Sequence, residues 1–155
     1  MKNLYRELAE KGLMKKEKID FLSVRKVLGK ARNNLKSARI LLSESQNENA
    51  FELAYEAMLS AGRALAFSFG LRPRAQGSHK IVIEFCRKAL RDSPPVLVQR
   101  FDAMRRKRHY LVYGAGLEIS KTEAKGAIEI AGRFLKEAEK MIRGRDPQRK
   151  LFEKD

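Results

Sequence analysis

The segment 49–69 constrains the fold more than any other part of the sequence. Its apolar residues recur at helical spacing in two stripes, one of small side chains (Ala50, Ala54, Ala57, Ala61, Ala64) and one of bulky side chains (Phe51, Tyr55, Met58, Leu65, Phe69). Only Glu52, Glu56, Ser60 and Arg63 form a narrow polar strip. A helix that is apolar nearly all round must be covered by other elements, and the alanines allow a neighbouring helix to approach to about 8–10 Å. The segment is therefore predicted to be the central helix of the fold.

The other periodic segments also have helical spacing. Helices are expected at about residues 3–11, 21–43, 78–90, 94–114 and 120–142. Ser93 and Pro94 suit the start of the fourth of these, and Ser120 with Glu123 forms a capping box at the start of the last. The sequence predicts an all-α fold, an antiparallel up-and-down bundle of about five helices plus a short N-terminal helix.

A chain of 155 residues is expected to form one domain. We expect an N-terminal helical arm and hinge at 1–17, the helical bundle at 18–145 and a polar C-terminal tail at 146–155. No run reaches about 18 apolar residues and no signal-peptide core is present, so a soluble cytoplasmic protein with no membrane partner is expected. The single cysteine, Cys86, is expected to be a small buried hydrophobe. No metal-ligand spacing occurs, and no cofactor is expected.

The charge of the chain is one-sided. Lys and Arg number 34 against 19 Asp and Glu, which gives a formal net charge of +15. A highly charged heat-stable surface is an alternative, but such surfaces usually mix Glu with Lys in ion-pair networks. The excess therefore favours an anionic partner, either nucleic acid or an acidic protein.

Four of these cations lie in the stretch "RRKRHYLVYG", residues 105–114. On the predicted helix, Arg108 takes a position in the heptad-like apolar series Leu97, Phe101, Met104 and Leu111. Arg108 is thus expected to point toward the core or a subunit interface, which is costly for a guanidinium unless it is paired and hydrogen-bonded. Two alternatives stay open: Arg108 pairs with Glu52 or Glu56 and is purely structural, or it faces an anion or a water-filled cleft.

The remaining polar residues of the stretch are less specific. Arg105, Arg106 and Lys107 suit a solvated rim, and Tyr110 and Tyr113 either stack on bases or wedge against neighbouring helices. His79, at a predicted helix start, is expected to have a capping or surface role.

The segments "AYEAMLSAGRALAFSFGLRP" and "SHKIVIEF", followed by the final pair of helices, resemble the HEPN superfamily over about residues 27–142. Members are small all-α bundles found alone, fused to, or encoded beside nucleotidyltransferases, often in toxin-antitoxin and defence systems. The resemblance implies a homodimer that binds RNA or nucleotide in a shared cleft. In the ribonuclease members, a motif Arg holds the scissile phosphate, and a His about five positions later takes the proton of the ribose hydroxyl without a metal.

On this sequence the motif falls on "RHYLVYG", with Arg108 as the motif arginine, His109 at the polar position and Tyr113 where the histidine is usual. The resemblance therefore implies Arg108, His109 and Tyr113 as the catalytic positions. From the charge of the stretch and the stacking capacity of tyrosine, RNA or phosphate contacts are expected at Arg105, Arg106, Lys107 and Tyr110. A tyrosine with a pKa of about 10 is a poor base at neutral pH, and His109 lies about 100° round the helix from Arg108.

Three hypotheses follow. The first, which we favour, is a dimeric HEPN protein that binds RNA or nucleotide in a basic cleft and cleaves RNA weakly or not at all. The second is a protein-interaction subunit of a separately encoded nucleotidyltransferase, which in related pairs modifies a tyrosine near the motif, here Tyr113 or Tyr110. The third is an active ribonuclease that uses His109, with Arg108 or Arg105 holding the phosphate.

Overall fold

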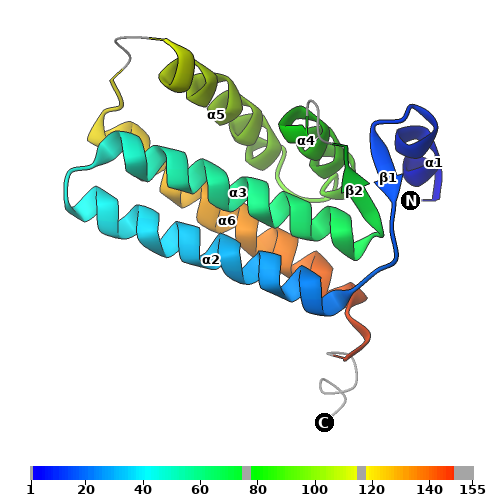
Figure 1. Ribbon diagram of the computed structural model, residues 1–155. Coiled ribbons are helices and arrows are strands. Elements are labelled where there is room, and N and C mark those ends of the chain that lie inside the picture. The colour runs from blue at the N-terminus through cyan, green and yellow to red at the C-terminus, as the bar shows by residue number, and fades with distance from the viewer. Residues whose placement is uncertain (1, 75–77, 115–117, 149–155) are drawn as a thin grey trace.

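A computed structural model describes residues 2–74, 78–114 and 118–148 of the chain. Within these ranges the chain forms six helices and two short strands (Figure 1). In chain order they are α1 (Lys2–Glu10), β1 (Met14–Lys16), α2 (Phe21–Ser43), α3 (Asn47–Ser68), β2 (Leu71–Pro73), α4 (Ser78–Ala89), α5 (Val96–Tyr113) and α6 (Lys121–Arg145). The predicted all-α bundle with a short N-terminal helix is confirmed.

The central helix is α3, as its two apolar stripes predict. It contacts α2, α6, α4 and α5, and Figure 1 shows α2, α3 and α6 lying side by side. Its alanine stripe is fully buried. Where α4 crosses α3, a Cβ added to Gly62 would lie 2.7 Å from Cγ1 of Val82. The absence of a side chain at Gly62 therefore allows α4 to pack closely against α3.

Local capping sets two of the helix starts. The Asp20 carboxylate accepts a hydrogen bond from the Leu22 N–H at 3.0 Å at the start of α2. The hydroxyl oxygen of Ser120 accepts one from the Glu123 N–H at 3.0 Å at the start of α6, which confirms the predicted N-cap.

The predicted cap of α5 is wrong. This helix begins at Val96, after Pro95, with no side-chain cap. The Ser93 hydroxyl instead donates to Oε2 of Glu137 on α6 at 3.1 Å. Ser93 therefore bonds to a residue of another helix and does not cap α5 as the local pattern predicted.

The two strands were not predicted. β1 pairs with β2 in antiparallel fashion, with Met14 opposite Pro73 and Lys16 opposite Leu71. Gly70, at φ 73°, turns the chain out of α3, and its carbonyl accepts the Glu17 N–H at 2.8 Å. This pairing ties the segment that we predicted to be a hinge to the C-terminal end of α3. The division of the chain into arm, bundle and tail stays a prediction.

None of the helices in the described ranges is both long enough and apolar enough to cross a bilayer. Cys86 is fully buried, as predicted. Its burial raises the pKa of the thiol, so the thiolate is disfavoured at neutral pH.

Candidate functional site

Residues 105–113 of the basic stretch form about the last two and a half turns of α5, and the side chains of residues 105–111 spread around the helix. Arg105 donates to Oδ1 of Asp102 at 3.0 Å, and Nε of Arg106 lies 3.7 Å from Oδ2 of the same carboxylate. Lys107 forms an ion pair with Glu123 of α6. The three cations that we predicted at the rim thus all have a carboxylate partner.

Arg108 points inward, as predicted, and meets α3. Its Nη2 lies 3.4 Å from Oε1 of Glu56, and its Cζ lies 5.5 Å from the ring centroid of Tyr55. Its Nε is buried and has no hydrogen-bond partner among the described residues. The contact with Glu56 matches the first alternative for Arg108. However, one long contact satisfies little of a five-donor guanidinium, so donors remain for an anion.

Tyr55 links this arginine to a histidine that our sequence analysis did not place in the site. Tyr55 is fully buried, and its hydroxyl lies 2.9 Å from Nδ1 of His79 in the first turn of α4. Burial raises the pKa of Tyr55 to about 12. The missed signal was Tyr55 itself, because a buried tyrosine hydroxyl usually has a polar partner.

His79 is half-buried, and more arginines than carboxylates lie around it. Its pKa is lowered, first by burial and then by Arg63 and Arg108, with Arg105 adding to the effect and Glu56 opposing it. Arg63 lies half-buried on α3, and no hydrogen bond or ion pair joins it to another residue of the described ranges. We call Tyr55, Glu56, Arg63, His79 and Arg108 the Arg108 cluster.

The other predicted site residues are described only in part. His109 is exposed, and its ring packs edge-on against Tyr110 with centroids 6.1 Å apart. Tyr110 is 61% exposed. Tyr113 is the last residue of α5, but its side chain lies outside the described part of the chain. Of the two predicted catalytic positions whose side chains are described, Arg108 lies in the Arg108 cluster and His109 is exposed.

The donor set of the Arg108 cluster suits an oxyanion rather than a cation. Its guanidinium and imidazole groups donate hydrogen bonds, and Glu56 is its only carboxylate. Within the described ranges, no group of three or more His, Cys, Asp or Glu side chains is placed to hold a metal ion.

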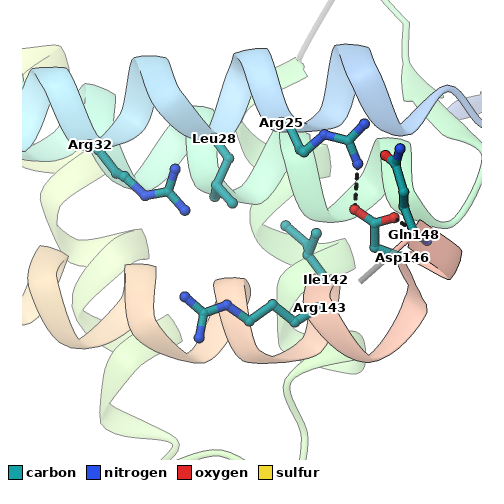
Figure 2. Close-up of a pocket in the computed structure, with 7 residues that line it drawn as sticks. All are labelled: Arg25, Leu28, Arg32, Ile142, Arg143, Asp146 and Gln148. Carbon is teal, nitrogen blue, oxygen red and sulfur yellow. Dashed lines mark hydrogen bonds and ion pairs between the residues drawn. The ribbon is translucent and has the colours of Figure 1, made fainter. Parts of the chain in front are cut away.

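A second basic region, which we call the α2/α6 pocket, lies between these two helices and has a volume of about 350 Å³ (Figure 2). Its lining consists of Arg25, Leu28, Arg32, Ile142, Arg143, Asp146 and Gln148. The Arg25–Asp146 ion pair measures 2.6 Å and the Arg32–Glu139 pair 2.7 Å, and Arg143 lies 3.9 Å from Glu139. Every arginine of this pocket therefore has a carboxylate partner.

Comparison with known proteins agrees with this architecture. The family model described as the HEPN domain matches residues 24–141. The match runs from the first turn of α2 into the last part of α6 and includes every residue of the Arg108 cluster. A search of curated proteins gives no match. Because the family model covers more than half of the chain, the chain belongs to the HEPN domain family.

Proposed function

We propose that this HEPN protein binds RNA or nucleotide at the Arg108 cluster, where the Arg108 guanidinium holds a phosphate. The observation that carries the proposal is the incomplete pairing of Arg108, which has one 3.4 Å contact with Glu56 and a buried Nε without a partner among the described residues. A phosphate offers oxygens in the planar, bidentate arrangement that a guanidinium prefers.

The charge around the cluster supports the same proposal. The net charge of +15 attracts polyanions over long range. At the rim, Arg106 is 65% exposed and Lys107 36% exposed. Exposed ion pairs contribute only about 0–1 kcal/mol, so these side chains can exchange a carboxylate for a phosphate at little cost.

Weak or absent RNA cleavage is part of the proposal. By the resemblance, Tyr113 stands where the ribonuclease members carry the histidine, and His109 is exposed with its ring against that of Tyr110. Metal-independent cleavage that is lost in His109→Ala would contradict this part and favour a ribonuclease. The homodimer with two clusters in one cleft, and the cytoplasmic location, remain proposals that rest on the family resemblance and on the sequence.

Fluorescence anisotropy with a labelled single-stranded RNA, measured at two salt concentrations, tests the proposal. The variants are Arg108→Ala and the matched control Arg32→Ala, which removes the same charge from the compensated α2/α6 pocket. A hydrogen-bonded charged group contributes about 1.5–3 kcal/mol, so Arg108→Ala is expected to weaken binding at least about tenfold. Arg32→Ala is expected to weaken it less than about threefold.

Two outcomes would overturn the proposal. The first is the absence of RNA or nucleotide binding by the wild-type protein at low salt. The second is an equal loss of affinity in Arg108→Ala and Arg32→Ala, because binding would then depend on net charge alone.

A second candidate function is that of an interaction subunit for a nucleotidyltransferase that modifies a tyrosine. The exposure of Tyr110 favours it, because a side chain that is 61% exposed is accessible to a modifying enzyme. Mass spectrometry after coexpression with such an enzyme is expected to show a nucleotide adduct that Tyr110→Phe removes. An adduct retained in this variant would direct attention to Tyr113, and no adduct at all would count against the candidate.

A further inference from the structure

We infer, on the basis of the proposed function, that Arg63 and His79 complete the phosphate site around Arg108, and that His79 serves there as a neutral hydrogen-bond donor through Nε2. The ligand is a phosphate group, carried either by RNA or by a free nucleotide. Neither residue belongs to the basic stretch on α5, and the two come from α3 and α4.

The protonation of His79 follows from its contact with Tyr55. The Tyr55 side chain is fully buried, so its hydroxyl cannot turn to water and loses free energy if it donates no hydrogen bond. Nδ1 of His79, at 2.9 Å, is its partner in the described part of the chain. With its pKa raised to about 12, the phenol keeps its proton at neutral pH. Tyr55 therefore donates to Nδ1, and the single ring proton of the neutral imidazole is on Nε2.

This tautomer decides what His79 can do. A protonated Nε2 donates a hydrogen bond to a phosphate oxygen, but it cannot accept the proton of a ribose hydroxyl. Since Nδ1 already accepts from Tyr55, neither ring nitrogen is left to act as a general base. His79 is thus a binding residue, positioned by Tyr55.

The charged groups around His79 keep its imidazole neutral. Those that face it from the helices packed against α4 are Glu56, Arg63, Arg105 and Arg108. The three arginines and burial disfavour an imidazolium, and Glu56 alone favours it. A neutral donor extends the hydrogen-bonding surface of the site without adding another cation to it.

Arg63 supplies the charge that Glu56 does not cancel. Glu56 and Arg63 are seven residues apart on α3, about two turns, so they lie on the same side of that helix. Glu56 pairs with Arg108, and Arg105 pairs with Asp102. Arg63 has no such partner in the described ranges. One positive charge therefore remains, which matches the single negative charge of a phosphodiester.

Nuclear magnetic resonance tests the tautomer directly, because the chain has only two histidines. In a long-range ¹H–¹⁵N correlation at pH 7, the His79 ring is expected to show a protonated Nε2 and an unprotonated Nδ1. Tyr55→Phe is expected to abolish this preference. The opposite tautomer in the wild-type protein would overturn the donor role of His79.

Ligand addition tests whether His79 is part of the phosphate site. Single-stranded RNA and adenosine monophosphate are titrated separately against the labelled protein, and the Nε2 resonance of His79 is expected to move. A shift with both ligands assigns the site to phosphate groups in general, and a shift with RNA alone assigns it to the phosphodiester of the polymer. If neither ligand moves the resonance although RNA binds, the inference is overturned.

Variants separate this inference from the proposed function. Arg63→Met and His79→Ala are each expected to weaken RNA binding by about fivefold to tenfold, with Arg32→Met as the matched control for Arg63. His79→Gln, which can return an N–H near the position of Nε2, is expected to recover most of the affinity, while His79→Asn is not.

Thermal unfolding verifies that each variant is folded. If Arg108→Ala abolishes binding but the Arg63 and His79 variants bind like wild type, this inference fails and the proposed function stands. If wild type binds no RNA or nucleotide, both fail.

Discussion

The Arg108 cluster and the α2/α6 pocket are both rich in arginine, yet they differ in how those arginines are compensated. In the α2/α6 pocket, Arg25 is paired with Asp146, whose side chain is only 8% exposed, at 2.6 Å. In the Arg108 cluster, the contact of Arg108 with Glu56 is longer, at 3.4 Å, and both side chains are about one-third exposed. Arg63 has no carboxylate partner in the described ranges. The number of cations thus does not identify an anion site; the supply of carboxylates around them does.

The largest expected effect is the loss of folding stability when the carboxylate of each region, Asp146 or Glu56, is removed. The buried Asp146 carboxylate accepts hydrogen bonds from Arg25 and from the Gln148 N–H. Asp146→Ala removes this acceptor and therefore both hydrogen bonds. We expect the free energy of unfolding in urea to fall by about 2 kcal/mol. Glu56→Ala is expected to lower it by less than about 1 kcal/mol, because its pair with Arg108 is partly exposed. Equal losses in the two variants would erase the distinction between the regions.

A smaller effect is expected on RNA affinity when each region loses a carboxylate charge without losing side-chain volume. Glu56→Gln frees Arg108 and is expected to strengthen RNA binding about fivefold, which corresponds to about 1 kcal/mol. The matched change Glu139→Gln frees Arg32 and Arg143 in the α2/α6 pocket. Its effect is expected to stay below about twofold at moderate salt. Anisotropy titrations compare the two, and a larger gain from Glu139→Gln would transfer the binding site to the α2/α6 pocket.

The smallest expected effect is a dependence of stability on pH that comes from His79. Its pKa is lowered in the folded protein from the ordinary value of 6.5. The unfolded chain therefore binds the proton more readily as the pH falls below about 6.5. This contribution to stability is complete above pH 6.5 and is lost as the pH falls toward the folded pKa.

Urea unfolding between pH 7.5 and 5.5 measures this effect, with His79→Gln as the variant that lacks it. We expect wild type to lose more stability than His79→Gln over this range. The pKa of Glu7 is lowered to about 2, and that of Glu123 is also lowered. Their contributions to folding stability are lost only as the pH falls below about 4.5, so they do not affect the measurement between pH 7.5 and 5.5. Parallel pH profiles of wild type and variant would show that burial and the neighbouring arginines do not lower the pKa of His79 in the folded protein.

The helices were largely predictable because their signals are local. The bounds of α2 agree with the predicted 21–43, and Ser120 caps α6 as its spacing to Glu123 predicts. The strands were missed because each has only three residues, too few to show alternation, and because each depends on a partner far away in the chain. The cap of α5 was predicted wrongly since Ser93 bonds to Glu137, 44 residues further on.

Within the candidate site, the sequence alone determined that Arg108 points inward, because the helical period of α5 fixes the direction of each side chain. The period also set Arg108 apart from Arg106, whose side chain is 65% exposed. Only the tertiary structure decided that Tyr55 holds His79. It also decided that Arg25 and Arg32 are paired, while Arg63 has no carboxylate partner among the residues that the structure describes. Hydrogen bonds and ion pairs between helices depend on the packing of segments far apart in the chain, and no local period contains that information.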